Sequence, residues 1–390
     1  MLTVVFAVIV IILAAGQLAS LLLAGYRMMA VRRRTLTGPG ADQAVSVIRP
    51  VCGLEHGLED TIRSGFRLSH PRFEMIFCLE EADDPAIPLL HRLMGEHPAV
   101  PARLLVGVEQ LNVNPKLNNI AKGYRAARHD LLMMVDSNVL METDSVERVM
   151  ADWTVGIGTV SAPGIGIAPD GFPAEIELAF LNTFQARWLY ASDALGAGYV
   201  QGKMMLFRRS DLESAGGLAA LADEIAEDSG LTKAMRRLGR SVRMTDCPFR
   251  HPVGRRALRD VWNRQARWAK LRRACFPWLY ASEIGASQAI LLALAAALVL
   301  VGGFSIAWVA ALAAALYGGE AALAALARWH LTALSPVHWL IRDALVPVVW
   351  LSGWSGRHFA WRGHDMHVGE VPEAARAQDG ARRPARAVER

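Results

Sequence analysis

Residues 131–138, LLMMVDSN, place an apolar run of five residues directly before an aspartate. A run this short, bounded by turn-forming residues, predicts a strand that is buried on both faces of a sheet. Comparable strand-like runs and intervening helix-like segments occur at 45–48, 58–68, 75–79, 87–95, 103–108 and 117–127. This alternation predicts an α/β domain with a mostly parallel sheet covered by helices on both faces. Because ligands of such sheets bind beyond the carboxyl ends of the strands, polar residues at those ends are the candidates for function.

Acidic residues occupy three such positions. Asp84 follows the strand that ends near residue 79, Asp136 follows the run at 131–135, and Asp228 stands beside Glu227 in a later helix-forming stretch. Each position alone also fits a turn, a helix N-cap or a solvated helix face. When a nucleotide sugar reacts, the charge of its leaving diphosphate is stabilised either by a divalent cation held by carboxylates or by fixed cations aimed at the phosphates, and a carboxylate takes the proton of the acceptor hydroxyl.

A fourth feature is the sequence RQARW at residues 264–268, in an amphipathic stretch just before an apolar block. The guanidinium of Arg267 is planar and always charged, which suits a leaving diphosphate, although Arg beside Trp also fits an interfacial anchor. The sequence contains neither GxGxxG nor GxxxxGK[ST], so the usual glycine-loop nucleotide binders are not indicated. The four features in this order are more informative than any one of them.

Apolar segments flank a globular domain at residues 40–280. Residues 1–31 predict an uncleaved transmembrane helix, because the basic residues at 32–34 follow the apolar run, whereas those of a signal peptide precede it. The same basic residues place the following domain in the cytoplasm. Residues 284–327 are divided by two glycines at 302–303 and predict two further transmembrane helices.

A third C-terminal block at residues 337–355 contains Arg342 and Asp343, which are costly in lipid unless they are paired or interfacial. The block therefore fits either a span or an interfacial helix. Four spans would return the C-terminus to the outside, whereas the basic residues after 356 favour the inside, so the number of spans stays open. Residues 368–390 are rich in Ala, Arg, Glu and Pro and predict a disordered tail.

Charge and cysteine content indicate which partners and which cellular compartment the protein has. The net charge is +5, and much of the excess lies beside the apolar segments, which indicates lipid headgroups and not nucleic acid as the partner. The four cysteines show no paired spacing, which fits a reduced compartment and argues against a disulfide framework or a zinc site. The bias toward Ala and Arg indicates a bacterial source, so the membrane is expected to be the inner one.

These motifs resemble lipid-directed inverting glycosyltransferases, and more specifically the ceramide glucosyltransferase family. The resemblance covers roughly residues 45–275 and includes DDPAI at 83–87, NPKLNN at 114–119, Asp136-Ser137, AED at 226–228 and RQARW at 264–268. The NPKLNN element is the most specific, because it separates this family from glycosyltransferases in general. The resemblance implies a GT-A catalytic domain, a Rossmann-like mixed sheet, between N-terminal and C-terminal transmembrane helices.

The resemblance also implies roles for individual residues. The general base would be Asp228, and Asp136 would hold a divalent cation, Mg²⁺ or Mn²⁺, on the diphosphate. The remaining candidates form the donor site (Asp84, Lys116, Asn118, Asp136, Arg267) and border the acceptor site (Arg264, Trp268). The donor would be a UDP-sugar, with glucose as the family default, and the acceptor would be the primary hydroxyl of ceramide.

The sequence departs from the family pattern at two positions, and alternatives for the acceptor and for catalytic activity remain open. The second motif reads Asp-Ser-Asn and not Asp-x-Asp, so a second metal-binding carboxylate is missing, and Ser229 stands where the family often has an aromatic residue. A hopanoid or diacylglycerol acceptor would use the same chemistry, and a non-catalytic nucleotide-binding membrane protein would keep the same fold. QARW at 185–188 is a near-copy of the later motif and is interpreted as structural or acceptor-lining.

Overall fold

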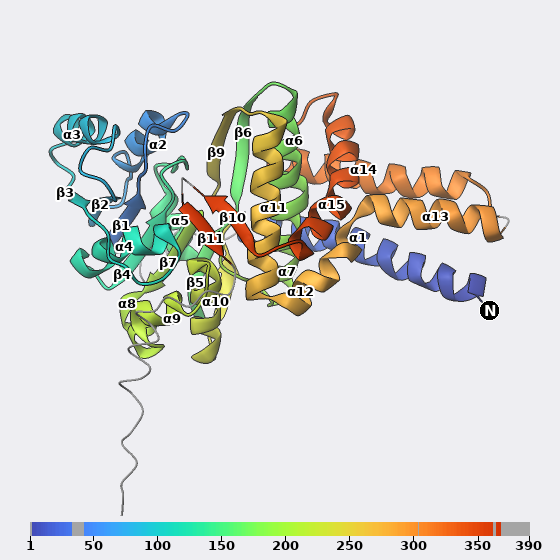
Figure 1. The fold of residues 1–390 in the computed structure, drawn as a ribbon, viewed down its shortest axis with the longest axis horizontal. Helices are drawn as coiled ribbons and strands as arrows, with labels where there is room; N and C mark the ends of the chain where they lie inside the picture. Colours follow the sequence, from blue (N-terminus) through green and yellow to red (C-terminus); the bar gives the residue numbers. More distant parts are fainter. Residues whose placement is uncertain (1, 33–42, 303, 362–363, 368–390) are drawn as a thin grey trace, which may run out of the picture.

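A computed structural model describes residues 2–32, 43–302, 304–361 and 364–367. Its centre is a seven-stranded sheet in the order β3-β2-β1-β4-β7-β5-β8 (Figure 1). The strands are β1 (Val45–Pro50), β2 (Phe73–Leu79), β3 (Ala102–Val106), β4 (Leu131–Val135), β5 (Ile157–Ala162), β7 (Met204–Arg208) and β8 (Ser241–Met244). The first four strands pair in parallel, whereas β7 runs antiparallel to both β4 and β5. The sheet is therefore mixed, and the expected α/β class is confirmed.

The sheet separates two apolar layers, and β4 shows why its sequence is a continuous apolar run. Leu132 and Met134 face one layer, while Leu131, Met133 and Val135 face the other. The helices of this domain are α2 (Leu58–Gly65), α3 (Ile87–Glu96), α4 (Pro115–Ala126), α5 (Ser145–Ala151), α8 (Arg209–Ser214), α9 (Gly217–Ala222) and α10 (Glu227–Arg237). The strands and helices predicted between residues 45 and 135 are confirmed, with ends shifted by a few residues.

A second group of elements lies between this sheet and the apolar helices (Figure 1). It contains a parallel pair of strands, β6 and β9, a C-terminal hairpin, β10 and β11, and a series of helices. Their bounds are β6 (Gly164–Asp170), α6 (Phe172–Ala179), η1 (Phe180–Ala186), α7 (Arg187–Ala194), β9 (Phe249–Arg255), α11 (Leu258–Cys275), α12 (Pro277–Ser282), η2 (Glu283–Ala286), β10 (His358–Trp361) and β11 (His364–His367). Helix α11 is central to this group because it carries the RQARW sequence.

Apolar helices extend from one side of the molecule: α1 (Leu2–Arg32), α13 (Gln288–Gly302) and α14 (Ala307–Ala327) (Figure 1). Two segments of the described chain, Thr3–Ala30 and Ala307–Ala327, are long and apolar enough to cross a membrane. A third candidate arises if Pro277–Ala286 and α13, which are bent by 54° relative to each other, form one broken span. These helices identify a membrane protein.

Helix α15 (Ser335–Trp354) covers most of the third C-terminal apolar block and runs crosswise to α13 and α14 (Figure 1). One side of α15 packs on α6 and α11 through Val346 and Val349. Its other side leaves Val337, Leu340 and Leu351 between 44% and 59% exposed. The helix is thus apolar toward the outside as well as at its packed contacts. The tail predicted at residues 368–390 lies outside the described residues.

A buried ionic cluster joins the apolar helices to the rest of the protein. Glu320 on α14 accepts hydrogen bonds from Arg187 of α7 at 3.0 Å and from Arg342 of α15 at 3.0 and 3.1 Å. Gln17 of α1 accepts from the same Arg187 at 3.0 Å, and all four side chains belong to residues that are 0% exposed. The near-copy motif at 185–188 therefore has a structural role, because its arginine ties α7 to the apolar helices α1 and α14.

Candidate active site

Asp136 and Lys203 lie side by side because β4 and β7 are antiparallel neighbours. Val135 at the end of β4 is paired with Met204 at the start of β7, so the next residue of one strand meets the preceding residue of the other. The backbone N–H of Asp136 donates to the carbonyl of Lys203 at 3.1 Å. The mixed sheet thus brings a lysine to the carboxyl end of β4, the position at which a ligand is expected.

Lys116 links Asp136 to a second carboxylate, Glu227. Helix α4 begins at Pro115 and is capped by Asn114, whose side chain accepts from the N–H groups of residues 116 and 117. This cap directs Lys116 into the site, where its Nζ lies 2.7 Å from Asp136 Oδ1 and 2.7 Å from Glu227 Oε1. Asn114 Nδ2 donates to the other oxygen of Glu227 at 2.7 Å. The start of the NPKLNN element therefore organises two acidic motifs that are far apart in sequence.

Ion pairing determines the charge of Asp136. Burial raises the pKa of its carboxyl, but the ammonium groups of Lys116 and Lys203 outweigh burial and hold this pKa well below its usual range. Lys203 Nζ lies 3.1 Å from Oδ2, so each carboxylate oxygen faces one lysine. Asp136 is therefore ionised at any physiological pH.

Asp228 has the opposite electrostatic environment. Burial, together with the neighbouring negative charge of Glu227, raises the pKa of Asp228 to about 7. Its two oxygens accept from the backbone N–H of Gly202 at 3.1 Å and of Ser229 at 2.7 Å. A carboxyl that titrates near neutral pH is suited to general-base chemistry, since it can both accept and release a proton.

Gly202 connects the two acidic centres. Its carbonyl accepts from Lys116 Nζ at 2.7 Å, while its N–H donates to Asp228. A Cβ at this position would lie 3.1 Å from both Lys116 Nζ and Glu227 Oε1, so a side chain would crowd the ion pair. The close approach of backbone to charged groups explains a glycine here.

The RQARW motif lies on α11, and its arginines and tryptophan contact different parts of the protein. Arg264 Nη1 lies 2.7 Å from the buried Glu177 of α6, and its guanidinium stacks 5.9 Å from the Trp268 ring. Trp268 packs against an apolar cluster that includes Leu178 and Val253. The guanidinium of Arg267 stacks on Trp361 of the C-terminal hairpin, 5.6 Å from the ring centroid. Arg264 and Trp268 thus position α11, and the hairpin covers Arg267.

Two predicted donor-site residues use their side chains for local backbone contacts. Asp84 accepts from the N–H of Gly53 at 2.9 Å and of Ala86 at 2.8 Å, which holds the ends of β1 and β2 together. Asn118 accepts from Leu111 and Asn112 at 2.9 and 3.1 Å and donates to Asn112 at 2.8 Å. In this structure both residues shape loops, and Lys116, Asp136 and Asp228 are the predicted residues that converge.

The sequence interpretation missed His251, as well as Lys203. His251 Nδ1 lies 2.8 Å from the carbonyl of Asn138, and burial, together with the positive charge of Lys203, holds the pKa of His251 well below its ordinary value. The ring is therefore neutral. Its Nε2 is buried and has no hydrogen-bond partner among the described residues. A lone histidine in β9 and a lone lysine before β7 carry no motif, so sequence alone offered no signal for either.

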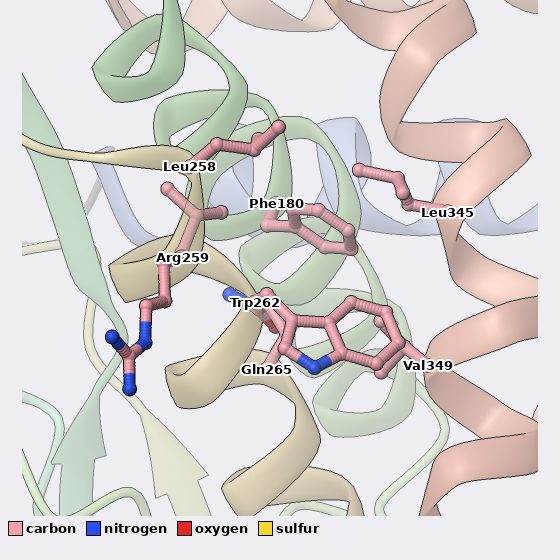
Figure 2. Close-up of a pocket in the computed structure, with 8 residues that line it drawn as sticks. Phe180, Leu258, Arg259, Trp262, Gln265, Leu345 and Val349 are labelled. Carbon is pink, nitrogen blue, oxygen red and sulfur yellow. The ribbon is translucent and has the colours of Figure 1, made fainter.

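An apolar cavity of about 320 Å³ lies on a different face of α11, between η1, α11 and α15 (Figure 2). Figure 2 shows Phe180, Trp262 and Leu345 around it, with Arg259 directed away. Its walls are almost entirely carbon, whereas a nucleotide diphosphate requires polar and charged partners. The cavity is therefore separate from the ionic site, toward the apolar helices.

Known proteins resemble this chain in sequence and in fold. A family profile described as glycosyl transferase family 21 matches residues 9–374. Ceramide glucosyltransferase 1 of Caenorhabditis elegans is 30% identical over 241 residues, which cover 61% of this chain and 52% of that protein. Ceramide glucosyltransferase of Komagataella phaffii is 30% identical over 207 residues, 47% of this chain and 41% of that protein. The chain thus spans about half the length, or less, of the curated relatives it matches.

Among solved structures, the mannosyltransferase PcManGT from Pyrobaculum calidifontis, in complex with GDP-Man and Mn²⁺, has a TM-score of 0.53 to this chain. The alignment covers 90% of this chain and 99% of that one at 18% identity, which establishes a shared fold. The GT-A architecture expected from the resemblance is confirmed. Since the family profile extends over most of the 390 residues, the chain belongs to glycosyl transferase family 21.

Proposed function

We propose that this protein is a membrane-bound hexosyltransferase that moves a sugar, glucose by family default, from a UDP-sugar to the primary hydroxyl of ceramide. The observation that carries the proposal is the position of Asp228, a partly buried carboxyl with a pKa of about 7, next to the Lys116–Asp136 ion pair. Asp228 can remove the proton of the acceptor hydroxyl while the neighbouring charged residues hold the diphosphate of the donor. The ceramide glucosyltransferases among its relatives support this choice of acceptor.

In the proposed mechanism, Asp228 accepts the proton of the lipid hydroxyl as the oxygen attacks the anomeric carbon. The new carbon–oxygen bond forms on the face opposite the bond that breaks, and the nucleoside diphosphate leaves with the electron pair. One displacement of this kind inverts the configuration at the sugar. The rate gain comes from orientation, from the positioned base, and from fixed positive charge near the departing oxygen.

A divalent cation on Asp136 is the expectation that agrees least with the geometry. Among the described residues, no group of three His, Cys, Asp or Glu side chains could hold a metal ion. Both oxygens of Asp136 face lysine ammonium groups, at 2.7 and 3.1 Å. The Mn²⁺ in the PcManGT complex belongs to that protein. The residues found here do not fit such an ion, and no step of the mechanism is routed through one.

The decisive experiment is an incubation of detergent-solubilised protein with ceramide and a panel of UDP-sugars, followed by mass spectrometry of the lipids. A hexosyl or hexuronosyl ceramide supports the proposal and identifies the sugar. Product from a total membrane lipid extract, but not from ceramide, would keep the transferase and reject ceramide in favour of a hopanoid, diacylglycerol or another lipid. Absence of product from every lipid would favour the non-catalytic alternative.

The rate should depend on pH as Asp228 titrates. A base must be deprotonated to act, so kcat/KM is expected to rise about tenfold per pH unit below about pH 7 and to level off above it. Glu227→Gln removes the neighbouring negative charge, which should shift the inflection to lower pH. Glu224→Gln, which alters an acid paired with Lys233, is the control and should leave the inflection in place. An unchanged inflection in Glu227→Gln would contradict the assignment.

We further propose that α1, α13 and α14 span the membrane and that α15 lies at its cytoplasmic surface. Three crossings place both the catalytic domain and the C-terminus in the cytoplasm, in agreement with the basic residues 32–34. An odd number of spans also agrees with the basic residues after 356, which four spans would place outside. The membrane is expected to be the bacterial inner membrane. The exposed apolar side of α15 suits an interfacial helix.

This arrangement predicts the behaviour of C-terminal fusions. A green fluorescent protein fused after residue 390 should fluoresce, whereas alkaline phosphatase at the same site should be inactive, because that enzyme requires an oxidising compartment. The same fusions placed between α13 and α14, near residue 304, should show the reverse pattern. High phosphatase activity at residue 390 would show that α15 crosses the membrane as a fourth span.

A further inference from the structure

Among the residues that the structure describes, acceptors are found for two of the three protons of the Lys203 ammonium group. A lysine Nζ carries three protons. Two of them are used by Asn138 Oδ1 at 2.8 Å and Asp136 Oδ2 at 3.1 Å. The side chain of Lys203 is 16% exposed, so the third proton is held at a site that is nearly closed.

Lys116 differs from Lys203 in this respect. All three of its protons have acceptors, namely Asp136, Glu227 and the carbonyl of Gly202, each at 2.7 Å. Lys116 is therefore committed to holding the acidic motifs together. Of the two lysines on Asp136, Lys203 is the one that can turn a proton toward an incoming oxygen.

The identity of residue 138, two positions after Asp136, also argues against a metal site. A carboxylate at 138 would complete an Asp-x-Asp pair of metal ligands, but the chain has Asn138, and its oxygen is bonded to Lys203. The formal charges of Asp136, Glu227, Lys116 and Lys203 sum to zero. A divalent cation placed here would be repelled by two ammonium groups and attracted by carboxylates that those groups already neutralise.

We propose that Lys203, oriented by Asp136 and Asn138, binds the diphosphate of the sugar donor in place of a divalent cation, so that donor binding and transfer proceed without metal. This inference rests on the proposed nucleotide-sugar function of the site. An ammonium supplies one positive charge and a directed proton to the departing oxygen, which is the electrostatic task that a bound cation performs elsewhere.

His251 provides the competing arrangement. Its neutral ring presents a buried Nε2 without a partner among the residues that the structure describes, next to Asn138 and within the influence of Lys203. This nitrogen is the histidine donor that a metal displacing Lys203 from Asp136 would recruit. If a metal binds in this way, replacing His251 must weaken the effect of metal on UDP binding. Our proposal requires that metal has no effect on UDP binding.

The first measurement is the affinity of the purified full-length protein for UDP, by titration calorimetry, in EDTA and in Mn²⁺. UDP binding needs no acceptor, so this measurement tests the proposal even if the acceptor lipid is not ceramide. The wild type should bind UDP with the same affinity, within about twofold, in both buffers. Affinity that is lost in EDTA and restored by Mn²⁺ would overturn the proposal, and a further loss in His251→Ala would identify that ring as a metal ligand.

Substitutions at residue 203 give the second measurement. Lys203→Met should weaken UDP binding about 10- to 100-fold, as expected for loss of a hydrogen bond from a charged group, and Lys203→Arg should restore part of it. Lys233→Met removes a lysine that pairs with Glu224 outside the site and serves as the matched control. Equal affinities for Lys203→Met and the control would refute a role for Lys203 in binding the diphosphate.

A double variant tests the exchange of lysine for metal directly. Lys203→Met together with Asn138→Asp removes the ammonium and creates an Asp-x-Asp pair. Its UDP affinity should now depend on Mn²⁺, falling more than about tenfold in EDTA. A double variant that folds, as judged by an unchanged melting curve, yet binds UDP equally well in both buffers would contradict the proposal. If no variant or wild type binds UDP, the proposed function itself is wrong.

Discussion

Asp228→Asn should lower the turnover number by about 10³-fold or more while UDP binding changes little. A positioned general base contributes roughly 10²–10⁴-fold to such reactions, and an amide cannot accept the proton. The substitution keeps the shape of the side chain. It also places an NH₂ group opposite the N–H of either Gly202 or Ser229, so a small loss of stability is expected as well.

Asp223→Asn is a suitable control for this experiment. Asp223 lies five residues before Asp228, is largely exposed, and pairs only loosely with Arg237 at 3.8 Å. Turnover of that variant should equal that of the wild type. If Asp228→Asn weakened UDP binding and raised the KM for the donor while kcat stayed unchanged, Asp228 would be a donor-binding residue and the base would be another group.

Glu320→Leu should produce the largest loss of stability. The substitution leaves Arg187 without its carboxylate, and among the described residues it leaves Arg342 one paired carboxylate, Asp343, at 2.8 Å. Removing one partner from a buried ion pair costs about 3–5 kcal/mol, since the remaining charge stays desolvated. In a chain of this size the apparent melting temperature should fall by roughly 5–10 °C. Glu320→Gln should have a smaller effect, because its amide oxygen can still accept one hydrogen bond.

Thermal unfolding in detergent, followed by tryptophan fluorescence, measures this effect. Glu142→Leu breaks the Arg250–Glu142 pair on the surface and provides the comparison, since exposed pairs contribute about 0–1 kcal/mol. Equal melting temperatures for Glu320→Leu and Glu142→Leu would show that the cluster is hydrated in the membrane-embedded protein and does not hold the helices together.

The sequence sufficed to predict those elements whose environment is local. Strand β4 is apolar at every position because both of its faces are buried, so its five residues are recognisable without knowledge of any neighbour. Helix α4 begins where Asn114 and Pro115 predict a capped start. The predicted convergence of Lys116, Asp136 and Asp228 came from resemblance, and the structure supplies its cause in the mixed sheet and in Gly202.

Features that depend on pairing over long sequence distances could not be predicted. Lys203 meets Asp136 only because β7 is antiparallel to β4, and nothing in the sequence around residue 203 reveals the direction of a strand. The charges of Arg342 and Asp343 made the third apolar block ambiguous, because their partner Glu320 lies on another helix. Asp84 and Asn118 matched family motifs, yet their side chains are bonded to nearby backbone, a distinction that requires coordinates.

The buried cluster around Glu320 also constrains the order in which the protein can be made. Helix α1 leaves the ribosome first, but the carboxylate that satisfies the arginine beside Gln17 arrives about 300 residues later. Until α14 has packed against α7, Arg187 lacks the carboxylate with which it pairs in the finished fold. Completion of the fold is thereby coupled to the placement of α14, and a nascent chain released before residue 320 has an unfinished junction between α1, α7 and α15.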